Sequence, residues 1–202
     1  MEIYIMRHGE TKWNKERRLQ GGSDIELNEN GIRLAEITSE KMCEINFDKV
    51  YSSPLKRACK TAEIIVAGRD MPIYTNSLIR EISFGEWEGI PDVELTEEGK
   101  DFKYFFKAPE LYRAPKSGES LETLCKRAAK FMSEVIEPEA ASCNKILIVA
   151  HGAINSALMT YIRNTKEIKD FWGDGLQKNC GVNIVDYSNN EYRILEYNKV
   201  YY

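Results

Sequence analysis

The sequence predicts an α/β fold: a three-layer α/β/α sandwich on a mostly parallel central sheet with an antiparallel edge strand. Short apolar runs alternate with longer segments in which apolar residues recur at helical spacing, a pattern typical of strands connected by helices. The run Ile146–Ala150 is apolar throughout, as expected for a strand that helices cover on both faces. Two late strand-like segments joined by the turn Tyr187–Asn190 predict a hairpin at the sheet edge.

In chain order, we expect strands over residues 2–7, 49–52, 72–74 with 78–80, 145–150, 181–187 and 192–197. Four helices are expected between them. The first covers about 29–44 with Asn28 as N-cap, and the second begins with Ser53 as N-cap and Pro54 at its first position. Apolar stripes over 121–135 and 154–162 predict the other two. No repeat or linker interrupts this order, so we expect residues 1–202 to form one domain.

Residues 84–118 depart from the alternation. They combine several glycines and prolines with seven aromatic residues, and short helices are expected around 91–96 and 99–107. A long excursion inside a compact domain is more often functional than incidental. We therefore expect a small helical cap over the open end of the sheet, although a satellite packing layer is the alternative.

Composition narrows the classes of function. The chain has 202 residues and a net charge of −4, from 28 Lys+Arg and 32 Asp+Glu, which disfavours general nucleic-acid binding. No segment approaches the roughly 20 apolar residues that cross a bilayer, so we expect no membrane association. The five scattered cysteines form no C-x-x-C pair, which favours free thiols and a cytoplasmic location.

Both histidines of the chain stand in the same local setting. His8 ends the first expected strand, His151 ends the strand over 145–150, and a glycine follows each. In an open α/β sheet, ligands bind in the crevice beyond the carboxyl ends of the strands. A single histidine at a strand end is usually structural, but two such junctions are expected to face one crevice if their strands are neighbours.

Two arginines and one glutamate can join the histidines. Arg7 precedes His8, and Arg57 lies in the first turn of a helix, where free N–H groups and the helix dipole favour anions. Guanidinium groups bind phosphate oxygens bidentately. Glu81 follows the expected strand over 78–80. Arg57 or Glu81 alone could be an ordinary surface charge, and the interest of Glu81 comes from its position at a third strand end.

This set of residues fits phosphoryl transfer through a histidine. A neutral imidazole attacks phosphorus, while Arg7, Arg57 and a protonated His151 offset the charge on the phosphoryl oxygens. Glu81 protonates the leaving alkoxide and then deprotonates the water that cleaves the phosphohistidine. We expect no metal and no cofactor, since cationic side chains supply the positive charge and the chain has no H-E-x-x-H or H-x-E…P-C-x-x-C motif.

The motifs around these residues resemble those of the histidine phosphatase superfamily, the phosphoglycerate-mutase-like enzymes. The likeness covers essentially the whole chain, in the family's order. Its segments are Ile5–Asn14, Leu19–Asp24 with Leu27–Gly31, Tyr51–Ala58, Arg80–Glu81 before Phe84–Gly89, and Val149–Gly152.

The resemblance implies that His8 is the phosphorylated nucleophile and Glu81 the proton donor. It also implies a phosphate pocket that includes Arg7, Arg57 and His151. Three further binding residues, Asn14, Gln20 and Gly21, come from the resemblance alone, and Gly152 contributes through its backbone.

Within the family, a phosphatase is favoured over a mutase. The gap from Glu81 to His151 is 151 − 81 = 70 residues, on the short side for a mutase. Residues 105–109 with 118–120 resemble those of small bacterial phosphatases of the broad-specificity and α-ribazole types. We expect a metal-independent phosphomonoester hydrolase that acts on a small phosphorylated metabolite as a monomer or homodimer. A cofactor-dependent phosphoglycerate mutase and a non-catalytic phosphate-binding regulatory protein are the alternatives.

Overall fold

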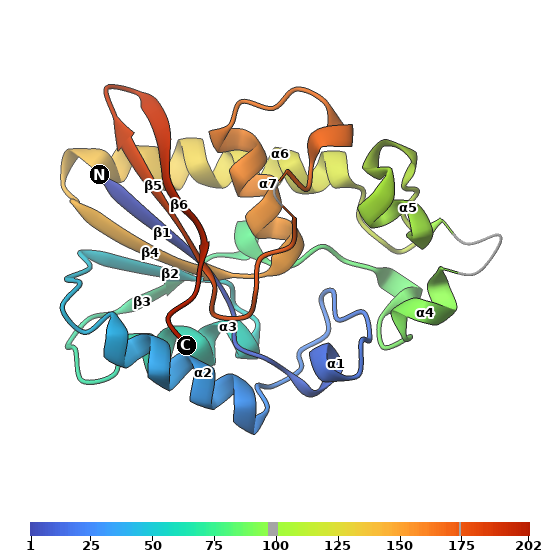
Figure 1. The fold of residues 1–202 in the computed structure, drawn as a ribbon. Helices are drawn as coiled ribbons and strands as arrows, with labels where there is room; N and C mark the ends of the chain where they lie inside the picture. Colours follow the sequence, from blue (N-terminus) through green and yellow to red (C-terminus); the bar gives the residue numbers. More distant parts are fainter. Residues whose placement is uncertain (97–100, 174) are drawn as a thin grey trace.

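The computed structural model describes residues 1–96, 101–173 and 175–202, and its centre is a mixed six-stranded sheet (Figure 1). The strands are β1 (Glu2–Arg7), β2 (Lys49–Ser52), β3 (Ile73–Thr75), β4 (Lys145–Ala150), β5 (Val182–Ser188) and β6 (Glu191–Lys199). Their order is β3-β2-β4-β1-β5-β6. The first four in this order are parallel, and β5 and β6 are antiparallel to their neighbours. The predicted fold class is confirmed.

Helices cover both faces of the sheet. The helices α2 (Glu29–Lys41) and α3 (Lys56–Ile65) lie on one face, and α6 (Leu121–Phe131) and α7 (Gly152–Ile162) on the other (Figure 1). In β4 the alternate residues Ile146 and Ile148 join the core under α6 and α7, whereas Leu147 and Val149 join the core under α3. Because both of its faces are buried, this strand has no polar side, and that explains its unbroken apolar run.

The edge hairpin forms through a two-residue turn. Asn189 and Asn190 connect β5 to β6 with φ of +53° and +62°. Tight hairpins with the right-handed twist of the sheet need positive φ at both central residues, and asparagine tolerates this conformation well. The hairpin is confirmed, and its second strand extends two residues beyond the expected end.

Two local expectations were wrong, and the helix expected over 121–135 forms with a change of helical type. Residues 77–79 form a 3-10 helix instead of a strand, because the side-chain oxygen of Asn76 accepts from the Leu78 N–H and turns the chain. Helix α3 begins at Lys56 with Leu55 as N-cap, and Ser53 is not its cap. Helix α6 ends at Phe131 and continues as one π-helical stretch, Met132–Ile136.

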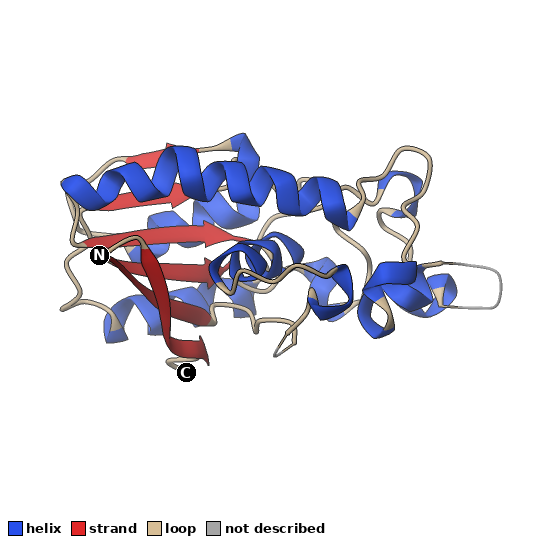
Figure 2. Cartoon of the chain, turned by 90° about the horizontal axis from the view of Figure 1, so that it is seen from above, coloured by secondary structure: helices blue, strands red, loops and turns tan. Residues whose placement is uncertain are grey.

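Residues 84–118 are called here the cap segment, and its described parts, 84–96 and 101–118, lie beyond the carboxyl ends of the parallel strands (Figure 2). They include α4 (Asp92–Leu95) and α5 (Phe102–Lys107), and the short α1 (Lys12–Lys15) follows β1. Part of the helix expected over 99–107 lies outside the described residues. The buried Phe102 and Phe105 stack at 5.3 Å between centroids, and the Trp172 indole donates to the Phe105 carbonyl. The cap segment is thus anchored to the loop after α7.

No helix of the described residues has the length and apolar character needed to cross a membrane. All five cysteines are free thiols, as the sequence predicted.

Candidate active site

The two histidines lie side by side because their strands are neighbours. β1 and β4 pair in parallel with Arg7 opposite Ala150, so the next residue on each strand is a histidine. The ring centroids of His8 and His151 are 5.1 Å apart at an interplanar angle of 60°, and both residues are buried. The crevice expected from the two strand ends is present.

The hydrogen bonds of His8 determine its tautomer. Its Nδ1 lies 2.6 Å from the Gly9 carbonyl oxygen, which can only accept, so Nδ1 carries the proton. Nε2 therefore keeps a lone pair. Burial, together with the positive charges of Arg57 and Arg7, holds the pKa of His8 well below 6.5. The imidazole is neutral at neutral pH, which is the form that attacks phosphorus.

Gly9 fixes the turn after His8 by close packing. A Cβ on Gly9 would lie 2.6 Å from the Gly31 carbonyl oxygen, in the first turn of α2. The Gly9 N–H donates to the Thr61 hydroxyl of α3, 3.0 Å away. Helices α2 and α3 thus hold the loop that begins at His8, and any side chain at position 9 would push this loop away.

Arg57 is fully buried and reaches three partners. Its Nη1 and Nη2 donate to the carbonyls of Ser23 (2.6 Å) and Gly21 (2.8 Å), and its Nε donates to His151 Nδ1 (3.1 Å). Burial lowers its pKa to about 10, so it stays charged at neutral pH. As expected, it lies in the first turn of α3, where its charge adds to the helix dipole.

His151 differs from the expectation of a protonated ring facing the phosphate. Because Arg57 donates to Nδ1, the proton lies on Nε2, which donates to the Ser53 hydroxyl at 2.7 Å. Burial, Arg57 and His8 hold the pKa of His151 well below 6.5. The ring is neutral and fully buried, and it does not line the cavity described below. In this structure it supports Arg57 from behind, and the Ser53 hydroxyl expected to cap α3 is its partner.

Arg7 presents an unpaired donor. Its Nη1 donates to the Gln177 carbonyl at 2.6 Å. Its buried Nε–H has no hydrogen-bond partner among the described residues. Buried N–H groups are nearly always paired in proteins, so this N–H is available to donate to an oxygen of a ligand.

Loop residues 20–23 form the opposite wall. Gly21 has φ of +51°, and a Cβ there would overlap the Glu88 carboxylate. Glu88 accepts from the Gly22 N–H, the Phe84 N–H and the Ser23 hydroxyl. This carboxylate therefore holds the loop whose carbonyls bind Arg57.

The two amide side chains implied by the resemblance face the same cavity. Asn14 Oδ1 accepts from the Thr11 N–H, and Gln20 Oε1 accepts from the Thr11 hydroxyl. With their oxygens occupied, both side chains have an NH2 group to offer a ligand. One residue, Thr11, thus orients both donors.

Glu81 is attached to the N-terminus of α7. Its Oε2 accepts from the Ala153 N–H, and its Oε1 accepts from the N–H groups of Ile154 and Ile82, all at 3.0–3.1 Å. His151 is the N-cap of α7 but gives no side-chain cap, so Glu81 performs that function from another segment. Gly152 leaves room for the Leu176 side chain, since a Cβ at position 152 would lie 2.6 Å from it.

A cavity of about 320 Å³ joins these groups. Its polar side is lined by Arg7, His8, Asn14, Gln20, Gly21, Arg57, Glu81 and Gly152. Its other side is aromatic and is lined by Trp13, Phe84, Phe102, Phe105, Phe106 and Trp172. The polar side offers several donors to an anion, and the aromatic side offers apolar surface to whatever the anion is attached to. Trp87 does not line the cavity, and its ring packs edge-to-face against Phe102.

No group of three or more His, Cys, Asp or Glu side chains that could hold a metal ion occurs within residues 1–96, 101–173 and 175–202.

Sequence reasoning missed several supporting residues. Glu88 stands in the quoted segment Phe84–Gly89, so its position was marked although no role was assigned to it. Gln177 and Asn179, which bind Arg7 and the His8 carbonyl, lie in an irregular loop and have no local sequence signal. Their placement depends on the return of the chain from α7 to β5.

Comparison with known proteins identifies relatives of this chain. The family model of the histidine phosphatase superfamily (branch 1) matches residues 3–200. A Bacillus subtilis protein named as the uncharacterised phosphatase PhoE is 35% identical over 196 residues, covering 97% of this chain and 93% of its own. A 2,3-bisphosphoglycerate-dependent phosphoglycerate mutase of Cytophaga hutchinsonii is 34% identical over 162 residues, covering 79% and 76%.

Solved structures give the same result. YhfR of Bacillus stearothermophilus superposes with a TM-score of 0.90 at 32% identity, covering 98% of this chain and 97% of that one. An Entamoeba histolytica phosphoserine phosphatase in complex with 3-phosphoglyceric acid superposes with a TM-score of 0.85 at 28% identity, covering 98% and 97%. With a family model matched over nearly its full length, the chain belongs to the histidine phosphatase superfamily.

Proposed function

We propose that this protein is a phosphomonoester hydrolase that works through a phosphohistidine on His8. The observation that carries the proposal is the 2.6 Å hydrogen bond from His8 Nδ1 to the Gly9 carbonyl. It leaves the Nε2 lone pair on a neutral ring in a cavity that Arg7 and Arg57 also line.

The first step transfers the phosphoryl group to the ring. His8 Nε2 forms a bond to phosphorus as the ester P–O bond breaks, and a protonated Glu81 gives its proton to the leaving alkoxide. Arg7, Arg57 and the amides of Asn14 and Gln20 bind the phosphoryl oxygens, whose charge is best stabilised by donors already in position.

The second step returns the enzyme to its starting state. The Glu81 carboxylate takes a proton from a water molecule, the water oxygen attacks phosphorus, and the P–N bond breaks. Orthophosphate leaves, His8 is again neutral and Glu81 is again protonated. No metal takes part in this scheme, since the positive charge comes from Arg7 and Arg57.

The aromatic side of the cavity supports a substrate with an apolar or ring-containing alcohol. Phe106 is 48% exposed and packs on Trp172 with ring centroids 4.8 Å apart. Exposed aromatic surface beside a polar site gains free energy when a ligand covers it. Phosphate esters of aromatic or extended apolar alcohols are therefore proposed to exceed small polar esters in kcat/KM.

The test is hydrolysis of p-nitrophenyl phosphate in EDTA by the intact chain and by His8→Ala. We expect phosphate release that EDTA leaves unchanged and the variant loses. Loss of activity in EDTA, or activity that survives in His8→Ala, would overturn the scheme. Interconversion of 2- and 3-phosphoglycerate with trace bisphosphoglycerate at a rate above phosphate release would instead assign a mutase.

A further inference from the structure

The segment that carries Glu81 lies outside the sheet. Residues 80–84 connect two 3-10 helices, η1 (Ser77–Ile79) and η2 (Gly85–Trp87). The hydrogen bonds between strands that position His8 at the end of β1 do not reach this segment. A carboxyl group that must meet a leaving oxygen to within a few tenths of an ångström needs some other support.

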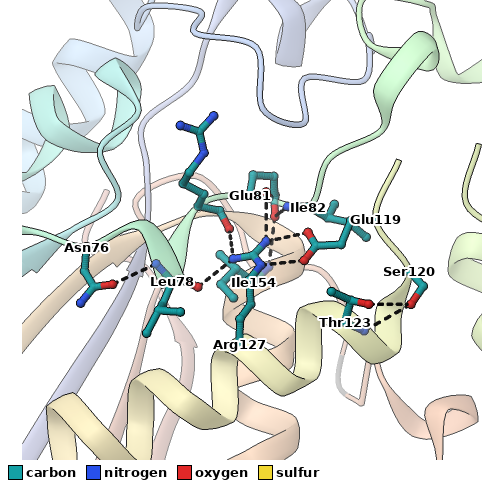
Figure 3. Close-up of polar contacts among 10 residues, drawn as sticks. Asn76, Leu78, Glu81, Ile82, Glu119, Ser120, Thr123, Arg127 and Ile154 are labelled. Carbon is teal, nitrogen blue, oxygen red and sulfur yellow. Dashed lines mark hydrogen bonds and ion pairs between the residues drawn. The ribbon is translucent and has the colours of Figure 1, made fainter. Parts of the chain in front are cut away.

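Arg127 of α6 donates hydrogen bonds to one carbonyl of η1 and to two carbonyls of this segment (Figure 3). Its Nη1 donates to the carbonyls of Leu78 (2.7 Å) and Arg80 (2.6 Å), and its Nη2 donates to the carbonyl of Glu81 (3.1 Å). A planar guanidinium has its donors in a fixed fork, so three carbonyls bound to one group are fixed relative to each other.

Glu119 uses the donors that remain. Its two carboxylate oxygens accept from Arg127 Nε (2.7 Å) and Nη2 (2.8 Å), and both side chains are at least four-fifths buried. All five guanidinium N–H groups are thereby used. The Glu119 backbone N–H also donates to the Ser83 carbonyl at 2.8 Å. Glu119 thus orients Arg127 and extends the support to residue 83.

Residue 81 is consequently held at both ends. Its carbonyl accepts from Arg127 on α6 (Figure 3), and its carboxylate accepts from the N–H groups of Ala153 and Ile154 on α7. His151 follows β4 directly and is the N-cap of α7. The position of the Glu81 carboxylate relative to His8 therefore depends on both helices.

We propose that Arg127, oriented by Glu119, is a positioning residue for proton transfer by Glu81. The proposal rests on the proposed function, in which Glu81 is the acid. Arg127 acts through the Glu81 backbone and touches no substrate, since it does not line the cavity. Phosphate binding by Arg7 and Arg57 does not involve it.

The test compares leaving groups. In Arg127→Met, kcat for an alkyl phosphate should fall about tenfold or more, because the poor leaving group needs the proton. For p-nitrophenyl phosphate, kcat should fall less than about threefold, because nitrophenolate needs little protonation. KM should stay within about twofold for both esters. In the double variant Glu81→Gln/Arg127→Met, the second substitution should add nothing to the first for the alkyl ester.

Matched variants separate positioning from folding. Lys130→Met removes an exposed cation from the same helix and should change neither rate. Arg127→Lys keeps the charge but not the fork and should reproduce the split between esters. Glu119→Gln is a milder change that should give a smaller split in the same direction, and it replaces Arg127→Met if that variant does not fold.

Three results would overturn the proposal: equal slowing of both esters in Arg127→Met, full activity in Arg127→Lys, or additive effects in the double variant. Failure of the proposed function itself has a different signature. If Glu81→Gln alone slows both esters equally, Glu81 is not the acid, and the role of Arg127 fails with it.

Discussion

The unfolding free energy of this protein should fall steeply as the pH is lowered from 7 to 5. The chain has two histidines. Both are buried, and both have a pKa well below the value of 6.5 that applies to the unfolded chain. Below pH 6.5 the unfolded chain takes up protons that the folded chain refuses, so acid favours unfolding.

The size of this effect follows from linkage. Each group that binds a proton only in the unfolded state costs about 1.4 kcal/mol per pH unit. Between pH 7 and pH 5 one histidine contributes up to about 2 kcal/mol and the pair up to about 4 kcal/mol. This is a large part of the 5–15 kcal/mol that stabilises an ordinary domain. The carboxyl groups with resolved shifts have ordinary pKa values of 3.8–4.5, and the fold lowers these values. They therefore titrate mainly below pH 5.

Urea denaturation at pH 7, 6 and 5 measures the effect. His8→Asn removes one of the two groups, and its amide can still donate to the Gly9 carbonyl. The variant should retain about half of the pH dependence. A free energy of unfolding that is flat from pH 7 to 5, or an unchanged slope in His8→Asn, would refute the assignment of two neutral buried rings.

Three further predictions concern activity. In the proposed mechanism the neutral form of His8 attacks phosphorus, and the pKa of His8 is lowered. The kcat/KM for p-nitrophenyl phosphate should therefore stay level down to pH 6 and show its acid limb well below 6.5. An acid limb centred at 6.5 or above would contradict this. Gly21→Ala should cost about 1–2 kcal/mol of stability through its left-handed φ and should also lower kcat/KM, because its Cβ displaces Glu88. The control Gly68→Ala, with φ of +79° and open space around it, should lose similar stability but no activity. Equal activity in the two variants would contradict the role of the loop over residues 20–23. Phe106→Ala should lower kcat/KM for naphthyl phosphate about fivefold to tenfold and hardly affect kcat/KM for glycerol phosphate. The control is Leu111→Ala, because Leu111 is equally exposed at 48% but does not line the cavity. An equal loss for both esters in Phe106→Ala would count against an aromatic leaving-group site.

The parts of the fold that sequence could predict are those set by local burial. β1, β2 and β4 have the expected bounds because each combines a buried apolar run with a polar residue at its end. The failure at 78–80 has a specific cause, since those residues look extended and a single Asn76 side chain turns them. The conformation of a short segment outside the sheet depends more on such side-chain contacts than on the periodicity of its apolar residues.

The site divides in the same way. His8, His151, Arg57 and their neighbours could be found because they stand at strand ends or in a first helical turn, where topology alone brings residues together. The protonation state of His151 could not be found, because it depends on Arg57 donating to the ring and on Ser53 accepting from it. Support by Glu88 and Arg127 likewise depends on contacts between segments more than 45 residues apart.

A covalent phosphoryl group on His8 is the central claim, and a rapid-quench experiment tests it most directly. The enzyme is mixed with an excess of p-nitrophenyl phosphate, stopped in alkali within the first turnovers, digested and mapped by mass spectrometry. We predict an acid-labile phosphoryl group on the peptide that contains His8 and no such group in His8→Ala. Steady turnover with no adduct, or with the adduct on another residue, would contradict the account.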